Sequence, residues 1–253
     1  MRDPYLYRHS TVLKNRANIR DEVELKKIEA DYTIYRLSEL VRCEFKGVFD
    51  CKCFCDIHYR IFRDVYEWAG EFRIINIEKM EPVLGEISIE YSAHEKILSE
   101  IEEITSEMNQ AAWRSMNIQE KTEKFSDYMA RLWKVHPYRD GNTRAIVTFC
   151  VLFIEAQGSY IDSTLFEENA LYMRDALVAA TACFQDLGDL RKLEYLYTIV
   201  YDALEKGEDF KRLIIEQMIE AKCVVTDESV REIAILNRKK GARLTINEIR
   251  DAL

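Results

Sequence analysis

Residues 145–154 are the segment that most constrains the fold of this chain. They read AIVTFCVLFI, are apolar on nearly every face of a helix, and are followed by Gly158 as a stop signal. A helix without a polar face is stable in water only when other elements surround it. The segment therefore predicts a central, buried helix with further elements packed around it.

Most other segments also show apolar residues at helical spacing. Such spacing is found in residues 22–40, 57–65, 97–108, 125–136, 165–182 and 190–204. The 253 residues include only 8 Gly and 3 Pro, which disfavours a many-turned sandwich or barrel. Because 48% of the residues are hydrophobic, the chain can bury a sizeable core. We expect an all-α fold with short connections between long helices.

One region departs from the helical pattern. Residues 73–77 and 87–89 are short β-favouring stretches, and Pro82 and Gly85 lie in a turn region between them. We expect a small β-hairpin on the helical body.

A charged segment, residues 205–209, is the predicted boundary between two parts of the chain. Residues 1–204 would form one domain, with helical elements at its N-terminal end. Residues 205–253 would form a C-terminal helical extension, whose role the sequence does not indicate. We expect three short helices there, and Thr245 with Glu248 three residues later caps the last of them.

The chain is acidic. It contains 36 Lys and Arg against 45 Asp and Glu, a formal net charge of −9. An acidic protein does not gain the counterion release that drives binding to nucleic acids, so neither DNA nor an anionic membrane is expected as its main partner. The first residues contain no apolar stretch long enough for a signal peptide, and no segment approaches membrane-spanning length. We expect a cytoplasmic protein, and export as an effector stays open.

The seven cysteines include a cluster at Cys51, Cys53 and Cys55. This spacing differs from the Cys-x-x-Cys knuckle of zinc sites, and no second Cys or His pair follows at zinc-ribbon distance. Free thiols are the better interpretation, and a zinc site is the alternative.

The candidate chemistry lies in residues 136–144, which read HPYRDGNTR and lead into the buried helix. His136 continues the apolar stripe of the preceding helix, and Pro137 ends that helix because the residue before a proline is disfavoured in the helical region. The N-terminus of the buried helix offers unpaired backbone N–H groups and the positive end of a dipole. Gly141 would let an anion approach this backbone closely. The pattern predicts a phosphate-binding loop.

The side chains of this loop suit the transfer of a phosphorus group. Arg144 can bind phosphate oxygens through its forked guanidinium, and Asn142 can add an amide donor. Asp140 is a single carboxylate of the kind that holds Mg²⁺ together with substrate phosphates. His136 can take a proton from an attacking hydroxyl near neutral pH; the alternative is a helix-end histidine stabilised by the dipole. His58 is interpreted as a packed helix residue outside the site. These residues alone predict Mg²⁺-dependent transfer of a phosphorus group from a nucleotide-like donor to a hydroxyl.

The loop resembles the signature of the Fic domain family, H-x-F-x-(D/E)-G-N-G-R-x-x-R. Residues 57–73 resemble the helix that precedes the family's flap, and with Asp3-Pro4-Tyr5 the resemblance spans residues 3–204. Members of this family move AMP from ATP to protein side chains. The resemblance implies a mostly helical Fic fold with a small hairpin flap. It also implies a protein adenylyltransferase that uses Mg²⁺ and ATP, modifies a Ser, Thr or Tyr of a target protein and releases pyrophosphate.

The resemblance assigns roles to the residues of the loop. His136 would be the base that deprotonates the target hydroxyl, and Asp140 the Mg²⁺ ligand. The nucleotide phosphates would be held by Gly141, Asn142, Thr143 and Arg144. Tyr138 would take the place of the family phenylalanine that anchors the loop in the core. Residues 78–87 would form the flap, on which a target protein docks by strand-like pairing.

Two positions depart from the family signature. Thr143 stands where the family usually has glycine, and Val147 where it has a second arginine, which in relatives contacts the terminal phosphate and an inhibitory glutamate. Two alternatives to AMP transfer stay open. One is a phosphotransferase that resembles the related Doc toxins, in which the nucleotide binds reversed, although that variant carries lysine at the position of Thr143. The other is a nucleotide-binding module whose catalysis is weakened through Thr143 and Val147. Self-modification, an antitoxin and a homo-oligomer are further partnerships that the resemblance leaves open.

Overall fold

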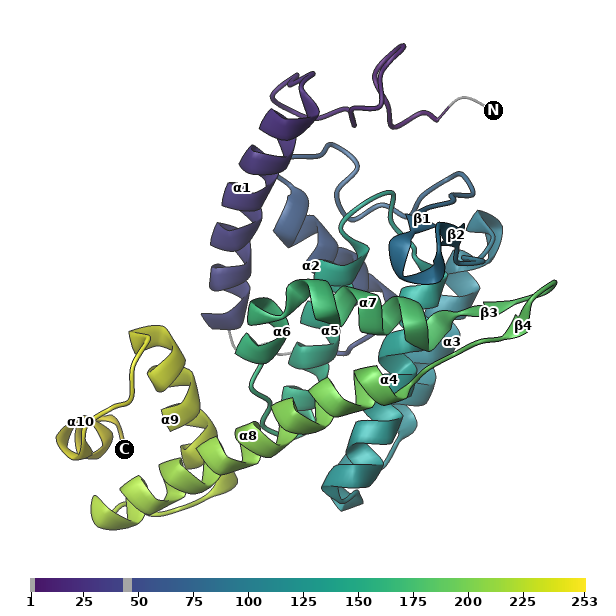
Figure 1. The fold of residues 1–253 in the computed structure, drawn as a ribbon. Helices are drawn as coiled ribbons and strands as arrows, with labels where there is room; N and C mark the ends of the chain where they lie inside the picture. The colour runs from purple at the N-terminus through teal and green to yellow at the C-terminus, as the bar shows by residue number, and fades with distance from the viewer. Residues whose placement is uncertain (1–2, 43–46) are drawn as a thin grey trace.

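The apolar segment of residues 145–154 lies in helix α5 (Asn142–Ala156), in the middle of the molecule in this computed structural model (Figure 1). The structure describes residues 3–42 and 47–253. Phe149 and Phe153 of α5 are fully buried, and their rings pack edge-on against Phe49 at centroid distances of 5.6 and 5.5 Å. The predicted central helix is confirmed, because neighbouring elements cover its apolar residues.

Helices make up 62% of the structure, which confirms the predicted all-α class. The other helices of the body are α1 (Glu22–Arg42), α2 (Cys51–Phe62), α3 (Ile97–Gln110), α4 (Ile118–Val135), α6 (Thr164–Glu168), α7 (Ala170–Thr181) and α8 (Glu194–Glu220), with 3₁₀ turns η1 (Pro82–Leu84), η2 (His94–Lys96) and η3 (Trp113–Ser115). Helices α2 and α4 contact α5 directly. Helix α1 lies on α2, and α4 also contacts α3, α7 and α8.

The strands of the described residues form two small antiparallel hairpins, β1 (Met80–Glu81) with β2 (Ile87–Ser88) and β3 (Cys183–Phe184) with β4 (Gly188–Asp189). The predicted hairpin is present, but its first strand is β1 and not residues 73–77. Arg73 gives the reason, because its backbone N–H donates to the carbonyl oxygen of Pro137 at 2.8 Å. This stretch therefore joins the loop before α5 and does not pair with β2. The β3–β4 hairpin is not indicated by the sequence pattern.

Helix α8 runs without a break through residues 205–209, where the sequence predicts a boundary. Gly207 lies inside this helix, and a Cβ atom there would be 2.2 Å from the carbonyl oxygen of Tyr160. This glycine therefore lets α8 pass close to the backbone of Tyr160 and does not end the helix. The division of the chain into residues 1–204 and 205–253 stays a prediction.

Helices α9 (Asp227–Lys240) and α10 (Ile246–Ala252) pack against the far end of α8 (Figure 1). With α8 they enclose a small core of Ile214, Met218, Ala221, Val230, Ile233, Ala234, Leu244 and Ile249. Thr245 and Glu248 cap α10 reciprocally, as predicted. The extension therefore consists of the end of α8 and two further helices, because the first of the three expected helices is continuous with α8.

No helix in the described ranges is long and apolar enough to cross a membrane. The cysteines described there, among them Cys51, Cys53 and Cys55, are free thiols. Cys43 lies outside the described residues. Within the described part of the chain, no three His, Cys, Asp or Glu side chains are grouped so that they could hold a metal ion.

Candidate functional site

His136 lies at the C-terminal end of helix α4, where the loop that leads into α5 begins. Asn117 and Glu120 cap the first turn of α4 reciprocally, which fixes where the helix begins. The helix ends at Val135, and His136 adopts a left-handed backbone conformation with a φ of 48°. The helix thus stops where Pro137 predicts.

The His136 ring has one nitrogen bonded and one nitrogen without a partner. The residue is only 3% exposed, and Nδ1 lies 3.3 Å from the carbonyl oxygen of Trp133. Because a carbonyl oxygen can only accept, Nδ1 carries the hydrogen. Nε2 is buried and has no hydrogen-bond partner among the described residues. The rings of Tyr91 and Trp133 pack against the imidazole at centroid distances of 4.2 and 5.1 Å. This tautomer leaves a lone pair on Nε2 that can accept a proton.

Burial lowers the pKa of His136 well below its ordinary value, and the positive charge of Lys79 lowers it further. The hydrogen bond to the Trp133 carbonyl works in the opposite direction without cancelling this shift. Near neutral pH the ring is therefore uncharged, which is the form that a general base needs. A histidine stabilised by the helix dipole would have a raised pKa, so the structure does not favour that alternative.

Asp140 keeps its negative charge in this environment. Burial alone would raise the pKa of its carboxyl group, but the charge of Lys79 and the N–H of Gly141 lead the opposing effects, and the pKa is lowered. Oδ1 accepts the Gly141 N–H at 2.6 Å, and Oδ2 accepts no hydrogen bond from a described residue. An ionised carboxylate with one oxygen available fits Mg²⁺ that is bound jointly with substrate phosphates.

The first turn of α5 presents backbone N–H groups. The first intrahelical bond runs from the N–H of Ala145 to the carbonyl oxygen of Gly141, at 3.0 Å. The N–H groups of Asn142, Thr143 and Arg144 donate to no described acceptor. Such groups at the positive end of a helix dipole form an anion-binding site.

Gly141 is needed for a different reason from the expected one. Its φ of 78° favours glycine, and a Cβ atom there would lie 2.3 Å from Cζ of Phe62. The Phe62 ring thus fills the space that we expected to admit an anion. Gly141 packs the loop against α2. The groups that can bind an anion are therefore the backbone N–H groups at the start of α5.

The Asn142 side chain closes the loop on itself. Its Nδ2 donates to the carbonyl oxygen of Tyr138 at 2.7 Å, and its Oδ1 accepts the Tyr138 N–H at 2.8 Å. Both ends of the amide are therefore used, and only the backbone N–H of Asn142 is available for a phosphate. Tyr138 itself is fully buried and donates its hydroxyl to the carbonyl oxygen of Phe54 at 3.1 Å. It anchors the loop in the core, as the resemblance implies.

Thr143 directs its hydroxyl toward the body of the protein. Its Oγ1 accepts the indole N–H of Trp133 at 3.0 Å, and the Trp133 ring packs edge-on against His136. The side chain that departs from the family signature is thus used to hold Trp133 in place beside the candidate base.

The Arg144 guanidinium is bound by α1. It forms an ion pair with Glu29, donates to Oγ1 of Thr33 at 3.1 Å and lies over the ring of Phe62 at 4.6 Å. An arginine in the first turn of a helix opposes the dipole, and the sequence predicts an anion beside it. In this structure the Glu29 carboxylate is that anion.

Two buried polar residues that were not assigned to the site hold the loop in place. Nε2 of His58 donates to the carbonyl oxygen of Asp140 at 3.1 Å, and the His58 ring stacks on Tyr138 with centroids 3.7 Å apart. Arg73 is 2% exposed, and its Nε donates to the carbonyl oxygen of His136 at 2.9 Å. Their signal in the sequence is a histidine between Ile57 and Tyr59 and an arginine between Phe72 and Ile74. We interpreted His58 as a packed residue, which is correct, but its partner was not foreseeable.

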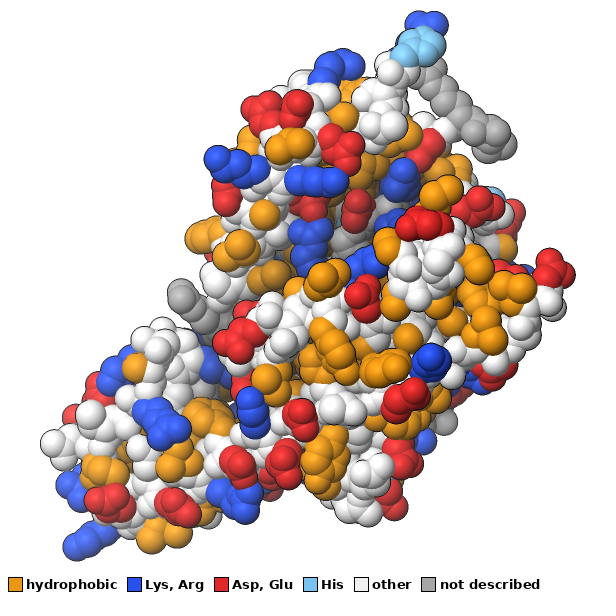
Figure 2. Space-filling model, in the orientation of Figure 1, with side chains coloured by type: hydrophobic (Ala, Val, Ile, Leu, Met, Phe, Trp, Pro, Cys, Tyr) orange, Lys and Arg blue, Asp and Glu red, His pale blue; other side chains and the backbone are white. Residues whose placement is uncertain are grey.

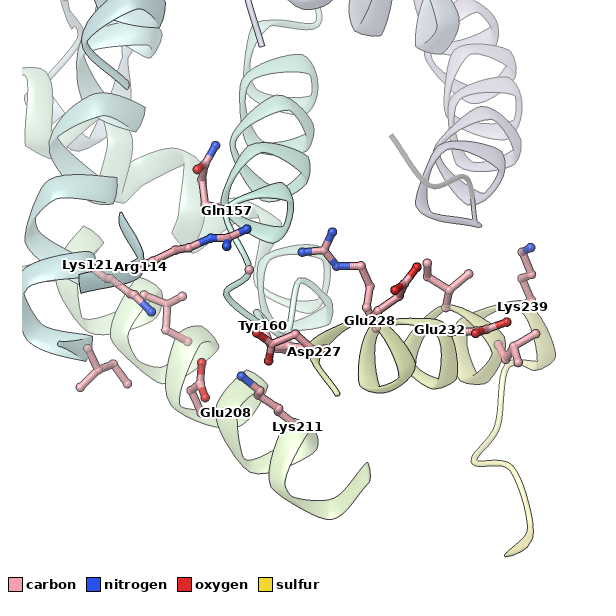
Figure 3. A pocket seen from close by; sticks show the side chains of 16 residues that line it. Arg114, Lys121, Gln157, Tyr160, Glu208, Lys211, Asp227, Glu228, Glu232 and Lys239 are labelled. Atoms are coloured by element: carbon pink, nitrogen blue, oxygen red, sulfur yellow. The ribbon is translucent and has the colours of Figure 1, made fainter. Parts of the chain in front are cut away.

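A cavity of about 920 Å³ lies away from this loop, where α8 and α9 meet the body (Figure 3). Side chains of both signs line it, among them Arg114, Lys121, Glu208 and Lys239. None of the loop residues discussed above contributes to it. On the face shown in Figure 2, Lys and Arg side chains gather instead in the hollow between α1 and the β1–β2 hairpin.

The chain is similar in sequence to known proteins. A family model described as the Fic/DOC family matches residues 48–154. The chain is 32% identical over 195 residues to the probable protein adenylyltransferase y4lH of Sinorhizobium fredii, which covers 76% of this chain and 92% of that protein. It is 30% identical over 161 residues to the protein adenylyltransferase VbhT of Bartonella schoenbuchensis, which covers 63% of this chain but only 32% of that longer protein.

Solved structures share the fold. The BepC protein of Bartonella tribocorum with bound AMPPNP superposes with a TM-score of 0.66 at 22% identity, over 79% of this chain and 95% of that one. The N-terminal Fic domain of a Bep effector from Bartonella quintana with bound ADP gives a TM-score of 0.65 at 21% identity, over 79% of this chain and 93% of that one.

Proposed function

Because this chain belongs to the Fic/DOC family, we propose that it is a protein adenylyltransferase that transfers AMP from ATP to a Ser, Thr or Tyr hydroxyl of a target protein. One observation carries this proposal. The unpartnered Nε2 of His136 lies on the loop that leads directly into the unpaired N–H groups of α5, so a base and a phosphate site adjoin each other.

The reaction follows from these groups. Nε2 of His136 takes the proton of the target hydroxyl, and the hydroxyl oxygen forms a bond to the α-phosphorus of ATP. The bond from the α-phosphorus to the oxygen that bridges to the β-phosphate breaks, and pyrophosphate leaves. The N–H groups of Asn142, Thr143 and Arg144 bind phosphate oxygens and hold the nucleotide in position. The target then carries AMP, and His136 carries the proton.

Asp140 is the residue that would hold Mg²⁺. When bound there, the ion would neutralise charge on the phosphates of ATP. The ionised Asp140 carboxylate supports this role, because Oδ2 has no described hydrogen-bond partner and Oδ1 is fixed by Gly141.

The target protein docks on the β1–β2 hairpin in this proposal. Met80, Val83 and Ile87 are exposed there, at 74%, 48% and 41%. A hairpin of short strands has unpaired backbone groups at its edges, so an extended target segment can add to it as a further strand. Exposed apolar side chains beside that edge would contribute to recognition of the segment.

Intact-mass spectrometry of the purified chain with Mg²⁺ and ATP tests the proposal. An added AMP mass that is absent from His136→Ala is the expected result. An added phosphate mass would instead support the phosphotransferase alternative. Tight binding of Mg²⁺ and ATP without any adduct, on the chain or on proteins of a lysate, would support the nucleotide-binding module.

A further inference from the structure

The arginines around the loop already have anionic partners. Nε of Arg139 lies 2.8 Å from Oδ2 of Asp3, and Nη1 of Arg174, in α7, lies 2.8 Å from Oε2 of Glu81. Arg144 is paired with Glu29, as described above. Each of these guanidinium charges is at least partly compensated by a carboxylate of the chain itself.

Lys79 differs from these arginines. Its ammonium forms no ion pair with any residue in the described ranges, although the residue is half-buried. The backbone around it is fixed, because its N–H donates to Oγ of Ser88 at 3.0 Å, one residue before β1 begins. The carboxylates of Asp140 and Glu81 compensate its charge only from beyond ion-pair distance. A partly buried cation without a direct ion pair is suited to an anion supplied from outside the chain.

The hairpin directs Lys79 toward the loop. Side chains alternate between the two faces of an extended segment, so Lys79 and Glu81 share a face and Met80 lies on the other. Met80 is 74% exposed and Glu81 is fully buried, which makes the face of Lys79 the inner one.

The contacts of Glu81 show what this inner face meets. Oε1 of Glu81 accepts the hydroxyl of Tyr91 at 3.0 Å, and the Tyr91 ring lies 4.2 Å from that of His136. The inner face of the hairpin therefore faces the candidate base. In agreement with this geometry, the charge of Lys79 lowers the pKa of His136.

We propose that Lys79 binds the oxygens of the α-phosphate, the group that is transferred. This inference rests on the proposed function. The transferred phosphorus has to lie within reach of a target hydroxyl that donates a hydrogen bond to Nε2 of His136. It also has to lie close to an ion held by Asp140. Lys79 approaches this region from the inner face of the hairpin. Its ammonium compensates the negative charge of the α-phosphate while the new bond forms.

Calorimetric titrations of Lys79→Met with ATP, AMP and adenosine test this role. A lost charge-assisted contact weakens binding about tenfold, so the affinities for ATP and AMP fall by about that factor while the affinity for adenosine is unchanged. Lys79→Arg retains most of the affinity. Lys96→Met, which removes an exposed lysine just after the hairpin, serves as the matched control and changes none of the three affinities.

Each other outcome overturns the inference in a distinct way. Weaker binding of ATP alone would place Lys79 at the outer phosphates, and unchanged binding of all three ligands would remove it from the nucleotide site. A variant that only raises the KM for the target protein, at unchanged kcat, would make Lys79 a docking residue. If the wild-type chain itself binds neither ATP nor AMP, the proposed function fails together with the inference, and this result is recognisable without any variant.

Discussion

Nε2 of His58 lies 3.1 Å from the carbonyl oxygen of Asp140, although 82 positions separate the two residues in sequence. The N–H of Gly70 donates to Nδ1 of the same ring at 2.8 Å, so Nε2 must carry the hydrogen and donate it. One neutral histidine thus ties α2 and the turn at Gly70 to the loop that presents Asp140.

Replacing His58 with alanine is expected to lower the free energy of unfolding by about 3 kcal/mol. The change opens a cavity and leaves the Gly70 N–H and the Asp140 carbonyl oxygen without their partner. Urea denaturation measures the effect. The control is Tyr59→Ala, which truncates a 45% exposed neighbour and is expected to cost less than the buried histidine. Equal losses for the two variants would contradict the bridging role of His58.

The two buried histidines make stability depend on pH. Burial lowers the pKa of His58 to about 3 and also lowers that of His136. The unfolded chain binds these protons near pH 6.5, so it takes up more protons than the folded chain below that value. The contribution of His58 is therefore complete above pH 6.5 and is lost as the pH falls from there to about 3.

NMR spectroscopy of the imidazole protons checks this behaviour directly. The resonances of His58 should stay at their neutral-form positions down to about pH 5, and those of His136 should titrate below the ordinary histidine pKa. Protonation of either ring between about pH 6 and pH 7 would show that its environment is more polar than the structure indicates.

Two glycine substitutions separate a steric clash from backbone strain. Gly141 and Gly241 both have positive φ, at 78° and 67°, but only at Gly141 would a Cβ atom meet another group, Cζ of Phe62 at 2.3 Å. We expect Gly241→Ala to cost about 1 kcal/mol and Gly141→Ala about 3 kcal/mol or more. Thermal and urea denaturation of both variants give the comparison, and similar losses would mean that Phe62 moves aside without penalty.

The strong periodic signals account for the parts of the fold that the sequence predicted. Residues 145–154 of α5 have no polar face, and α4 has an apolar stripe that ends at Pro137, so each could be recognised from a few neighbouring residues. The first strand of the hairpin could not be recognised in this way. The backbone N–H of Arg73 donates to the carbonyl oxygen of Pro137, so residues 73–77 join the loop before α5 and do not pair with β2. The continuity of α8 depends in the same way on Gly207 fitting against Tyr160.

In the candidate site, too, contacts between residues distant in sequence could not be predicted. His136, Asp140 and the first turn of α5 are contiguous in sequence, so their proximity could be predicted. The pairing of Arg144 with Glu29 and the position of Lys79 near the loop could not, because α1 and the hairpin come close to the loop only through tertiary packing. The use of the Asn142 amide inside the loop also depends on the exact fold of the loop backbone, which residue types alone do not determine.

Asp140→Asn keeps the shape of the side chain and removes its charge. We expect Mg²⁺ to strengthen ATP binding to the wild-type chain and to have little effect on the variant, because a neutral amide is a much weaker ligand for this ion. Calorimetric titration with ATP at increasing Mg²⁺ concentrations measures the difference. An unchanged Mg²⁺ dependence would exclude Asp140 as the metal ligand.

The role of His136 as the base for AMP transfer is tested most directly by label from ATP carrying ³²P in the α-phosphate, followed in lysate proteins and in the chain itself. The wild-type chain is expected to transfer this label, and His136→Ala, folded by circular dichroism, to transfer it at least about a hundredfold more slowly. Transfer by the variant at the wild-type rate would contradict the assignment of the base. In a parallel reaction with ATP labelled in the γ-phosphate, transfer of that label alone would contradict AMP transfer itself.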